Sequence, residues 1–572
     1  MSSKARRASS KTKTAGWSPR LGPAVALAVL FLLTALLGVW AAYDRAAAWR
    51  AFALIAAGQA AMAAIVWLSR RGGAAALGWL SVAMALLAGA LGLYFLQSYD
   101  FAAGAGKFDL VQRLGLWVQA RRPALLLPED INANVAANGL IITLGLGLGA
   151  LLWASRERRW AVLALAGLPW LAGLFALLLT GSRGAWLGMA AGGLVMFYLL
   201  LRRRWSQRPA ARWLLDVLAL AAVLLLAVGF WAALRWPETV QALGNVAAGG
   251  GLMSRGMLWQ HGLDLVADYP FTGSGLRSTM MVHASYSLLI HVGFISHMHN
   301  LPLQVAIEQG LPASAALLGL LALAGASVVS ATQPGRRRWR FGLAAGAALA
   351  AMAVHGMVDA AVYSSLLLPL LFLPIGFALA ADQRSPTAEE PDRERPAWLL
   401  GLALMAMAAL ALITLAPATR AGLQANLGAV SQTRGELALY QWPAWPLQDE
   451  LRRTSAVDLA PAIARYQAAL AENPANAAAN RRLGQIELSL GQYDAAQPHL
   501  EAAYRAAPAN RAARQMLAES YAIAGDVERA AALLRTIDLG QNQIDTRMWW
   551  YNHIGQPQRA ELLRQAKELA GQ

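Results

Sequence analysis

A short polar segment, SHMHNLPLQVAIEQG, leads into one of the most apolar stretches of the chain and carries two imidazole groups, His297 and His299. A neutral imidazole can accept a proton near neutral pH, so either residue is a candidate general base. If the segment continues as a helix, Asn300, Gln304 and Glu308 follow at four-residue intervals and share one face. Polar side chains are costly against lipid, so this face is expected to point into a helix bundle or a water-filled cavity. The alternative, that these groups only hydrogen-bond neighbouring helices, stays open at this stage.

Two arginines add a second kind of chemistry. Arg183 stands in TGSRGAWLG at the edge of an apolar stretch, and Arg255 stands in a long loop, in SRGMLWQHG. A guanidinium group keeps its charge and binds phosphate oxygens through a fixed fork of donors. Two such groups at one membrane face suit an anionic, membrane-borne ligand such as a lipid pyrophosphate. The competing interpretation is structural ion pairing, for which Asp264, Asp268 and Asp359 are acidic candidates.

The composition indicates the class of protein that must position these residues. The chain has 572 residues, of which 57% are hydrophobic and 14% charged, as is typical of a polytopic membrane protein. A bilayer core of about 30 Å needs about 20 apolar residues per helix, which predicts an all-α transmembrane bundle of about 11–12 spans. The absence of cysteine excludes disulfides and thiol catalysis. The predicted spans lie near 21–43, 50–69, 73–97, 137–155, 160–180, 184–201, 213–235, 301–330, 341–359, 364–381 and 397–416.

The basic residues orient these spans. Short cytoplasmic loops are rich in Lys and Arg, and such clusters recur at every second loop, at 70–71, 156–159, 202–208 and 336–340. The basic N-terminus, residues 1–20, is therefore predicted to be cytoplasmic. The transmembrane domain 21–416 then has a large extracytoplasmic loop at 236–300, and the chain after 417 is also extracytoplasmic. This topology explains most of the net charge of +17 without nucleic acid, and it predicts a multi-pass protein of the inner (plasma) membrane.

After a predicted linker at 417–455, the sequence repeats with a period of 34 residues in a soluble α-helical domain at 456–572. Small alanines let paired helices approach closely, and prolines end the second helix of each pair. The pattern resembles the tetratricopeptide repeat. Such a module either packs against the membrane domain or offers a groove to an acceptor or partner protein, and the sequence leaves both open. The repeated positions are Ala462, Ala496 and Ala530, Pro474 and Pro508, and Gly491 and Gly525.

Four segments, in order, resemble the family of O-antigen ligases and O-antigen polymerases, which includes the protein O-oligosaccharyltransferases. TGSRGAWLG resembles the Ser-Arg-Gly start of a spanning helix, and SRGMLWQHGLDLVADYPFTGSGLRS resembles the Arg…Trp…Pro…Gly-x-Gly block. HMHNLPLQVAIEQGLPA resembles the His-Asn…Glu-x-Gly helix start, and VHGMVDAAVYSSLLLPLLFLPIG the closing His…Asp…Pro helix. The resemblance covers roughly residues 130–380.

This resemblance implies a membrane glycosyltransferase that takes a glycan from an undecaprenyl-pyrophosphate carrier and passes it to an acceptor hydroxyl on the extracytoplasmic face. The acceptor would be a lipid such as the lipid A core of lipopolysaccharide, a polysaccharide or a protein. A polymerase of the same family would instead extend its own lipid-linked polysaccharide. Carried onto this chain, the family pattern assigns catalysis to His299 and pyrophosphate binding to Arg183 and Arg255. Residues that would support this site are Arg277, His297, Asn300, Gln304 and Glu308.

The residue types fit a metal-independent, inverting transfer that needs no cofactor. The hydroxyl attacks the anomeric carbon while an imidazole accepts its proton and guanidinium groups stabilise the departing phosphates. The sequence contains neither an Asp-x-Asp pair nor a Cys/His cluster with metal-ligand spacing. AAGGGLMSRG also lacks the Lys-Ser/Thr ending of a nucleotide-binding loop. A transporter or a membrane-anchored repeat scaffold without enzymatic activity is the remaining alternative.

Overall fold

The computed structural model describes residues 20–103, 108–123, 131–235, 255–383, 416–441, 446–537 and 543–571. Three predicted features lie wholly or partly outside these residues. They are the basic N-terminus up to residue 19, the first part of the predicted large loop at 236–254, and nearly all of the span predicted at 397–416.

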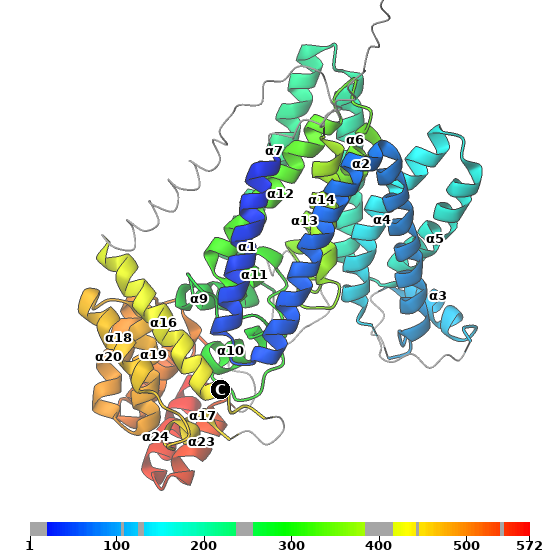
Figure 1. The fold of residues 1–572 in the computed structure, drawn as a ribbon. Coiled ribbons are helices and arrows are strands. Elements are labelled where there is room, and N and C mark those ends of the chain that lie inside the picture. Colours follow the sequence, from blue (N-terminus) through cyan, green and yellow to red (C-terminus); the bar gives the residue numbers. More distant parts are fainter. Residues whose placement is uncertain are drawn as a thin grey trace, which may run out of the picture.

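The described residues form helices and no strand, which confirms the predicted all-α fold (Figure 1). Six of the described helices are long and apolar enough to cross a membrane, namely α1, α2, α4, α5, α6 and α12. The chain is therefore a multi-pass membrane protein. Its bundle consists of α1 (Leu21–Ala41), α2 (Arg45–Ser98), α4 (Ala133–Arg156), α5 (Trp160–Leu179), α6 (Arg183–Arg204), α7 (Pro209–Arg235), α12 (Leu311–Ala331), α13 (Trp339–Gly356) and α14 (Leu373–Ala381).

The long helix α2 contains two of the predicted spans. At Gly73 the backbone has φ 63° and ψ −142°, which lies outside helical geometry and divides α2 into two limbs. Glycine reaches this positive φ without the steric cost of a Cβ atom. The spans predicted at 50–69 and 73–97 lie in the limbs before and after this break.

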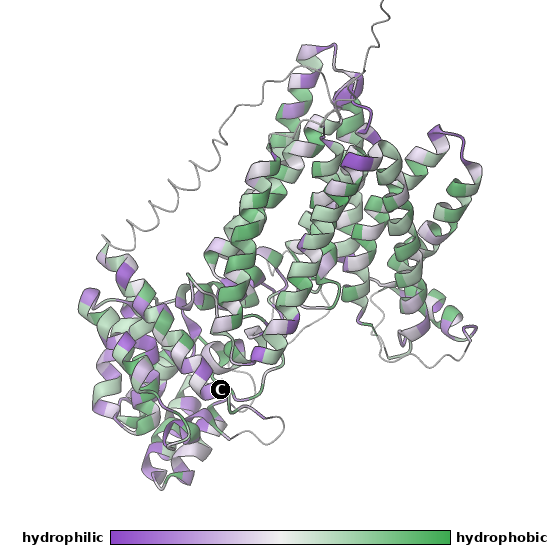
Figure 2. Ribbon diagram, in the orientation of Figure 1, coloured by the Kyte–Doolittle hydropathy of each residue, from purple (hydrophilic) through white to green (hydrophobic). Residues whose placement is uncertain are grey.

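The two ends of the bundle differ in character. The turns that join α4 to α5 and α6 to α7 contain the basic clusters RERR and RRRWSQR and lie at one end (Figure 1). The short helices α9 (Arg255–Asp268) and α10 (Thr279–His283) lie at the other end, next to the helical repeats, and α3 (Asp109–Gln119) lies at the same end beside α5, away from the repeats. Hydrophobic residues predominate along the bundle, hydrophilic residues gather in the basic turns, and the repeats mix the two kinds (Figure 2).

The Gly-x-Gly turn in the large loop fastens this loop to the bundle. A Cβ atom on Gly273 would lie 2.3 Å from the backbone nitrogen of Gln309, and Gly273 has φ 68°. The backbone N–H of Ser274 donates to the Ile307 carbonyl at 2.7 Å, and that of Leu276 donates to the Gly38 carbonyl at 3.0 Å. The turn is thus wedged between α1 and α11 (Leu301–Gln309), which leaves no room for larger residues.

A second glycine interrupts the span predicted at 301–330. Gly310 has φ 85° and separates α11 from α12. A Cβ atom there would lie 2.6 Å from the Phe271 carbonyl oxygen. The predicted continuous helix is therefore two helices, because the close approach of residue 271 and the positive φ both require glycine. The loop before α11 also contains a π-helix, η1 (Ala284–Leu288), and a 3-10 helix, η2 (Leu368–Phe372), precedes α14.

The C-terminal helices form pairs, as the 34-residue period predicts. Ala462, Ala496 and Ala530 are at most 1% exposed and lie where the paired helices meet. The helices are α18 (Ala460–Glu472), α19 (Ala477–Leu490), α20 (Tyr493–Ala506), α21 (Arg511–Ile523), α22 (Val527–Leu534), α23 (Gln543–His553) and α24 (Pro557–Ala570).

The region predicted as a linker, 417–455, also contains helices. α16 (Pro417–Leu437) packs along α18, and α17 (Gln448–Arg452) packs on α19. The hydroxyl of Tyr466 donates to Gln432 of α16 at 2.8 Å. A Cβ atom on Gly428 would lie 2.7 Å from the same ring. The polar sequence of α16 predicts a linker. In the structure, however, its polar face is an internal face of the helical array.

Candidate active site

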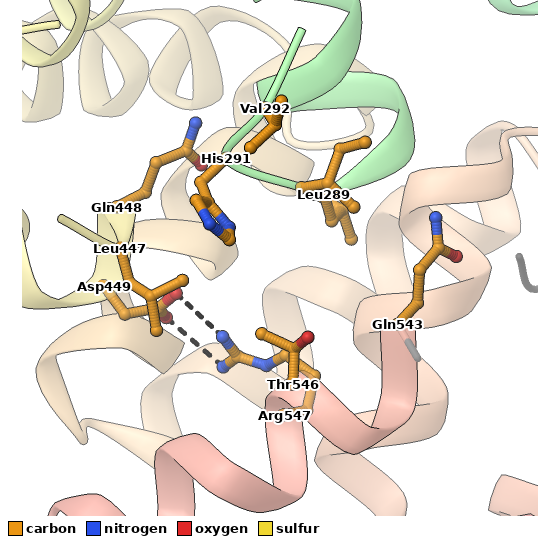
Figure 3. Close-up of a pocket in the computed structure, with 10 residues that line it drawn as sticks. Leu289, His291, Val292, Leu447, Gln448, Asp449, Gln543, Thr546 and Arg547 are labelled. Atoms are coloured by element: carbon orange, nitrogen blue, oxygen red, sulfur yellow. Dashed lines mark hydrogen bonds and ion pairs between the residues drawn. The ribbon is translucent and has the colours of Figure 1, made fainter. Parts of the chain in front are cut away.

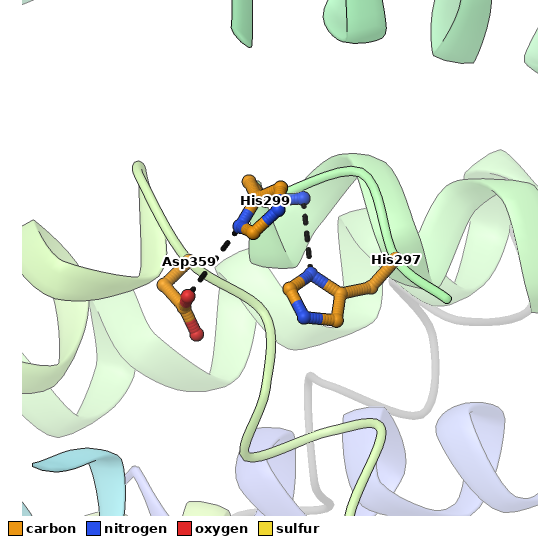
Figure 4. A group of neighbouring side chains, drawn as sticks. All are labelled: His297, His299 and Asp359. Carbon is orange, nitrogen blue, oxygen red and sulfur yellow. Dashed lines mark hydrogen bonds and ion pairs between the residues drawn. The ribbon is translucent and has the colours of Figure 1, made fainter. Parts of the chain in front are cut away.

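His297, His299 and Asp359 lie together where α11 begins and α13 ends (Figure 4). The Nδ1 atom of His299 is 3.5 Å from Oδ2 of Asp359. The backbone N–H of His299 donates to Nδ1 of His297 at 3.3 Å, and the two rings meet edge to face. The His299 side chain is 29% exposed, whereas that of Asp359 is 2% exposed. A buried carboxylate thus supports an imidazole that remains accessible.

Asn300 holds His299 in this position. Its side-chain oxygen caps α11 by accepting the backbone N–H of Leu303 at 3.0 Å, and its amide donates to the Met357 carbonyl at 3.1 Å. His299 itself has φ 51°, a left-handed conformation that is uncommon for a residue with a Cβ atom. Such strain persists only where the surroundings enforce it, and it is concentrated at functional sites.

Asp359 is held through its other oxygen. Oδ1 accepts hydrogen bonds from the Asn138 amide at 2.9 Å and from the Ala361 backbone N–H at 2.7 Å. Among the described residues, neither Oδ2 of Asp359 nor Nδ1 of His299 has a hydrogen-bond partner, so the two atoms are left to face each other. The carboxylate favours the tautomer with the proton on Nδ1, which leaves Nε2 of His299 free to accept a proton.

Arg183 and Arg255 lie at the same site, as the first residues of α6 and α9. Both residues keep surface that is accessible to solvent, and neither forms an ion pair with any residue that the structure describes. The pKa of Arg255 lies below its usual value, mainly because the surrounding protein displaces water. The charge of Asp359 raises this pKa and that of Arg183 lowers it, so the three charged groups are neighbours.

Glycines on α6 bring Arg183 to this place. A Cβ atom on Gly184 would lie 2.8 Å from Nδ1 of His355, and one on Gly188 would lie 2.7 Å from the Ala351 carbonyl oxygen. Small residues at four-residue spacing allow α6 to lie directly against α13. The glycine of the Ser-Arg-Gly motif thus sets Arg183 beside the end of α13, just before Asp359.

Gln304 and Glu308 are buried, and their partners are protein groups. Gln304 accepts the backbone N–H of Met298 at 3.0 Å and donates to the Thr279 hydroxyl at 2.8 Å. Glu308 accepts from Gln304 at 2.8 Å, from the Thr279 hydroxyl at 2.9 Å and from the Arg277 backbone N–H at 2.9 Å. The sequence left two roles open for these residues, which were to face a water-filled cavity or to hydrogen-bond neighbouring segments. This geometry fits the second role. Gln304 and Glu308 therefore support the segment that carries the histidines.

Three other residues considered from the sequence lie away from His299. The Arg277 guanidinium donates to the Ser365 carbonyl at 3.2 Å, and the described residues give it no ion pair. Asp268 is paired with Arg481 and Arg482 of the repeats. Asp264 faces the repeats as well, and burial raises its pKa to about 6.

His297 accepts a hydrogen bond through Nδ1 because its ring is neutral. Burial, followed by the neighbouring His299, lowers the pKa of His297 to about 4. His297, His299 and Asp359 also offer ligand atoms within 4.8 Å of one another, a spacing that a metal ion can bridge. The two nearby guanidinium groups repel a divalent cation, so the charges favour acid–base chemistry. The absence of a metal requirement stays a prediction.

Sequence reasoning misses Asn138 and does not single out Asp359 from the other acidic residues. Each of these two residues has a feature in the sequence from which a functional role could be predicted. An amide in the middle of an apolar span is a functional candidate by default, because lipid cannot satisfy its hydrogen bonds. Asp359 follows His355 by four residues in VHGMVD, a spacing that places both at the same end of one helix.

Comparison with known proteins agrees with the fold and the motifs. A multi-pass membrane bundle followed by helical repeats is the class that the structure defines. Residues 168–318 match the family model described as O-antigen ligase, and residues 487–549 match that of the tetratricopeptide repeat. Both resemblances inferred from the motifs are thereby confirmed, and the chain carries a domain of the O-antigen ligase and polymerase type. Arg183, Arg255 and His299 lie inside the matched segment, and Asp359 lies beyond it. No relative was found among curated proteins.

Proposed function

We propose that this protein transfers a glycan from an undecaprenyl-pyrophosphate carrier to an acceptor hydroxyl, without a metal ion and with inversion of the anomeric centre. The observation that carries this proposal is the pairing of His299 with the buried carboxylate of Asp359 beside Arg183 and Arg255. An accessible imidazole supported by a carboxylate is suited to general base catalysis. Two guanidinium groups next to it are suited to holding a pyrophosphate.

Each of these residues has a separate role in the proposed reaction. Nε2 of His299 accepts the proton of the acceptor hydroxyl as its oxygen forms a bond to the anomeric carbon. The bond from that carbon to the pyrophosphate oxygen breaks, and its electron pair leaves with the pyrophosphate. Arg183 and Arg255 stabilise the charge that accumulates on the phosphates, and Asp359 stabilises the imidazolium ion. Attack opposite the leaving group inverts the configuration.

The orientation follows from the positions of the basic clusters. The candidate site and the repeats lie at the end of the bundle opposite the basic turns between α4 and α5 and between α6 and α7. Because basic turns favour the cytoplasm, we place the site and the repeats on the extracytoplasmic face of the inner membrane. A lipid-linked glycan carried on that face then reaches the two arginines from the membrane.

The test uses purified full-length protein, an undecaprenyl-pyrophosphate-linked glycan and separate lipid, polysaccharide and protein acceptors. Transfer is measured in the presence and absence of a chelator, and donor binding is measured independently. His299→Ala is expected to lose transfer by about 10²–10⁴-fold while still binding the donor, since general base catalysis is worth that much.

Near-normal transfer by His299→Ala, or loss of transfer on adding the chelator, would contradict this mechanism. The product distinguishes the two activities of the family. Growth of the glycan on its own carrier identifies a polymerase, and transfer to a separate acceptor identifies a ligase.

A further inference from the structure

The short helix α3 has an exposed apolar stripe at the end of the bundle where the candidate site lies (Figure 1). Leu110, Leu114 and Trp117 follow one another at intervals of four and three residues, so they share one side of the helix. Their exposed fractions are 69%, 39% and 54%. A contiguous stripe of exposed apolar side chains marks a surface that contacts a partner or a membrane.

A neighbouring side of α3 attaches the helix to the bundle. Val111 and Val118 pack against the bundle core, and Gly115 lies so close to the Phe101 ring that a Cβ atom has no room. The side chain of Gln119 accepts the backbone N–H of Phe101 at 2.7 Å. These contacts fix the rotation of α3 about its axis, so the apolar stripe is held away from the bundle.

The helix beside α3 shows what surrounds this end of the bundle. α3 packs against α5, which is long and apolar enough to cross a membrane. Leu171, Phe175 and Leu178, in the half of α5 that leads to α3, share one side of α5 and are 57%, 38% and 50% exposed. On a membrane-spanning helix such a side faces lipid. Lipid therefore covers the bundle up to the end at which α3 lies.

Tryptophan–arginine pairs occur at both ends of the bundle. Tryptophan is enriched where a membrane meets water, with its ring at the level of the lipid headgroups. At the basic end, the guanidinium group of Arg71 lies 4.3 Å from the centre of the Trp67 ring. At the other end, the guanidinium group of Arg121 lies 4.5 Å from the centre of the Trp117 ring of α3. Each end thus has the composition of a membrane surface, and α3 lies within one of them.

The segment from residue 108 to 123 is also positively charged. It contains Arg113, Arg121 and Arg122 and a single acidic residue, Asp109. The side chains of Arg113 and Asp109 are 80% and 91% exposed and 4.0 Å apart, so water screens their attraction and Arg113 stays available to another anion. The described partners of Arg121 are the ring and the carbonyl of Trp117, and neither carries a negative charge. Exposed guanidinium groups beside an apolar stripe suit the phosphate groups of membrane lipids.

An arginine at a cavity of the repeats has the opposite character. This cavity of about 130 Å³ lies between the loop 289–292 and the helices α17 and α23 (Figure 3). Its Arg547 lies 2.7 Å from Asp449 and 2.6 Å from Glu519, and its side chain is 11% exposed. The charge of Arg547 is balanced inside the protein, so it does not attract a lipid phosphate. The arginines at α3 keep their charge available to solvent.

An aromatic contact connects α3 to the candidate site. Phe108, directly before α3, stacks on Trp186 of α6 with the ring centres 5.0 Å apart. Trp186 follows Arg183 by three residues, and its indole N–H donates to the Leu177 carbonyl of α5 at 3.3 Å. The position of α3 at the membrane surface therefore helps to set the depth of Arg183.

We propose that α3 lies among the headgroups of the leaflet nearest the candidate site and binds anionic phospholipids. Leu110, Leu114 and Trp117 enter the boundary of the acyl chains, and Arg113 and Arg121 hold lipid phosphate groups. This lipid-binding surface goes beyond the proposed glycan transfer and does not depend on it. Through the contact between Phe108 and α6, it keeps the candidate site at the level of the lipid phosphates.

The absence of cysteine from the chain allows one fluorophore to be placed at a chosen position. Leu114→Cys carries the label on the apolar stripe, and Gln112→Cys carries the same label on the opposite side of α3. The full-length protein is reconstituted into phosphatidylcholine vesicles that contain a small fraction of a spin-labelled quencher lipid. The quencher has a phosphatidylglycerol headgroup in one series and a phosphatidylcholine headgroup in the other, with the spin label on the acyl chain next to the headgroup.

Both quencher lipids are expected to quench the label at residue 114, and to quench the label at residue 112 much less. Phosphatidylglycerol should be preferred at low salt by about fivefold for each arginine, because a basic residue near an anionic lipid surface contributes that much. The double substitution Arg113→Gln and Arg121→Gln should remove this preference but not the quenching by phosphatidylcholine. The matched control, Arg505→Gln on the exposed face of α20, should keep the preference.

Two sets of results would overturn the proposal. Equal quenching at residues 112 and 114, no quenching at residue 114, or disulfide formation between Leu114→Cys residues of two protein copies would contradict the contact between the stripe and the membrane. Equal quenching by the two lipids at residue 114, or a preference that persists without Arg113 and Arg121, would contradict the binding of anionic headgroups by these arginines.

Discussion

Asp268 of α9 and Arg482 of α19 form a fully buried ion pair, with Oδ2 of Asp268 lying 2.7 Å from a guanidinium nitrogen of Arg482. Arg481 pairs with the same carboxylate, and the Arg482 guanidinium stacks 3.7 Å from the centre of the Tyr286 ring. The repeats are therefore fixed onto the loop that leads to His299. They are an integral support of the candidate site.

Removing the carboxylate from this ion pair should be strongly destabilising. Burial alone would raise the pKa of Asp268, but the charges of Arg481 and Arg482 hold it below its usual value. Asp268→Asn leaves two buried guanidinium groups without a counter-charge, so a loss of about 3–5 kcal/mol is expected. Thermal unfolding of the purified protein measures this loss.

The matched control for Asp268→Asn is Glu561→Gln, which removes one partner of an exposed ion pair with Arg564. Solvent screens an exposed pair and it contributes little to stability, so this variant should unfold close to the parent temperature. Equal effects of the two substitutions would show that the repeats do not depend on the buried pair.

Asp359→Asn tests whether the carboxylate supports His299. The amide is nearly isosteric but carries no charge, so it neither fixes the Nδ1–H tautomer nor stabilises the imidazolium ion. The maximal rate of transfer should fall by about 10²–10⁴-fold with donor affinity little changed. A purely structural role would instead lower donor affinity and thermal stability together with the rate.

Arg255→Lys tests the two-pronged binding of phosphate. Lysine keeps the positive charge but loses the planar fork of donors, so donor affinity is expected to fall by at least about tenfold. Arg277→Lys is a suitable comparison, because the Arg277 guanidinium contacts the Ser365 carbonyl and lies outside the cluster around Asp359. Binding of the lipid-linked donor in detergent reports both variants. Unchanged affinity in Arg255→Lys would remove Arg255 from the pyrophosphate site.

Much of this architecture follows from local sequence patterns. Apolar stretches of sufficient length predict the spans, and the 34-residue spacing of Ala462, Ala496 and Ala530 predicts the helix pairs. These features are local because a helix satisfies its own backbone hydrogen bonds and a repeat contacts its neighbour. The motifs around Arg183 and His299 are also contiguous in the sequence, so their resemblance to a family can be recognised from the sequence alone.

The remaining features depend on contacts between distant segments. Asn138 meets Asp359 across 221 residues, and Arg482 meets Asp268 across 214. No periodicity encodes such a meeting, since it depends on how α4, α9, α13 and α19 are arranged in space. The helical pairing of α16 with α18 is hidden for a similar reason, because its polar face becomes internal only when Tyr466 packs on Gly428.

Ala496→Phe tests the packing of the repeats. Ala496 is fully buried, and its carbonyl oxygen lies close to Gly484 of the paired helix. A phenyl ring has no space between α19 and α20, so overpacking should lower the free energy of unfolding by about 1–3 kcal/mol. Protease resistance of the full-length protein reports this change. Ala495→Phe, one residue earlier on the exposed face of α20, should have little effect.

Acid should loosen the contact between the loop and the repeats through a buried histidine pair. Nδ1 of His261 lies 3.2 Å from Nε2 of His283. Burial, aided by Arg511 and Arg514, lowers the pKa of His261 to about 4, and burial, aided by His261 and Arg511, lowers that of His283 to about 3.

The sign of the effect follows from the two states of the chain. In the unfolded chain both histidines take up protons near pH 6.5, whereas the folded protein resists protonation until about pH 4. Stability present above pH 6.5 is therefore lost as the pH falls, at up to about 1.4 kcal/mol per pH unit for each histidine. Asp264 acts in the opposite direction, because its raised pKa of about 6 favours the folded state at low pH. It offsets the loss of stability caused by only one of the two histidines.

Thermal unfolding at pH 7, 5.5 and 4.5 measures this dependence. The double substitution His261→Asn and His283→Gln places amide groups near the same nitrogen positions and does not titrate. Its unfolding temperature should fall less between pH 7 and 4.5 than that of the parent, because only the other buried groups, among them His297 and Asp264, still titrate. A double variant with the same acid sensitivity as the parent would assign the effect to other groups.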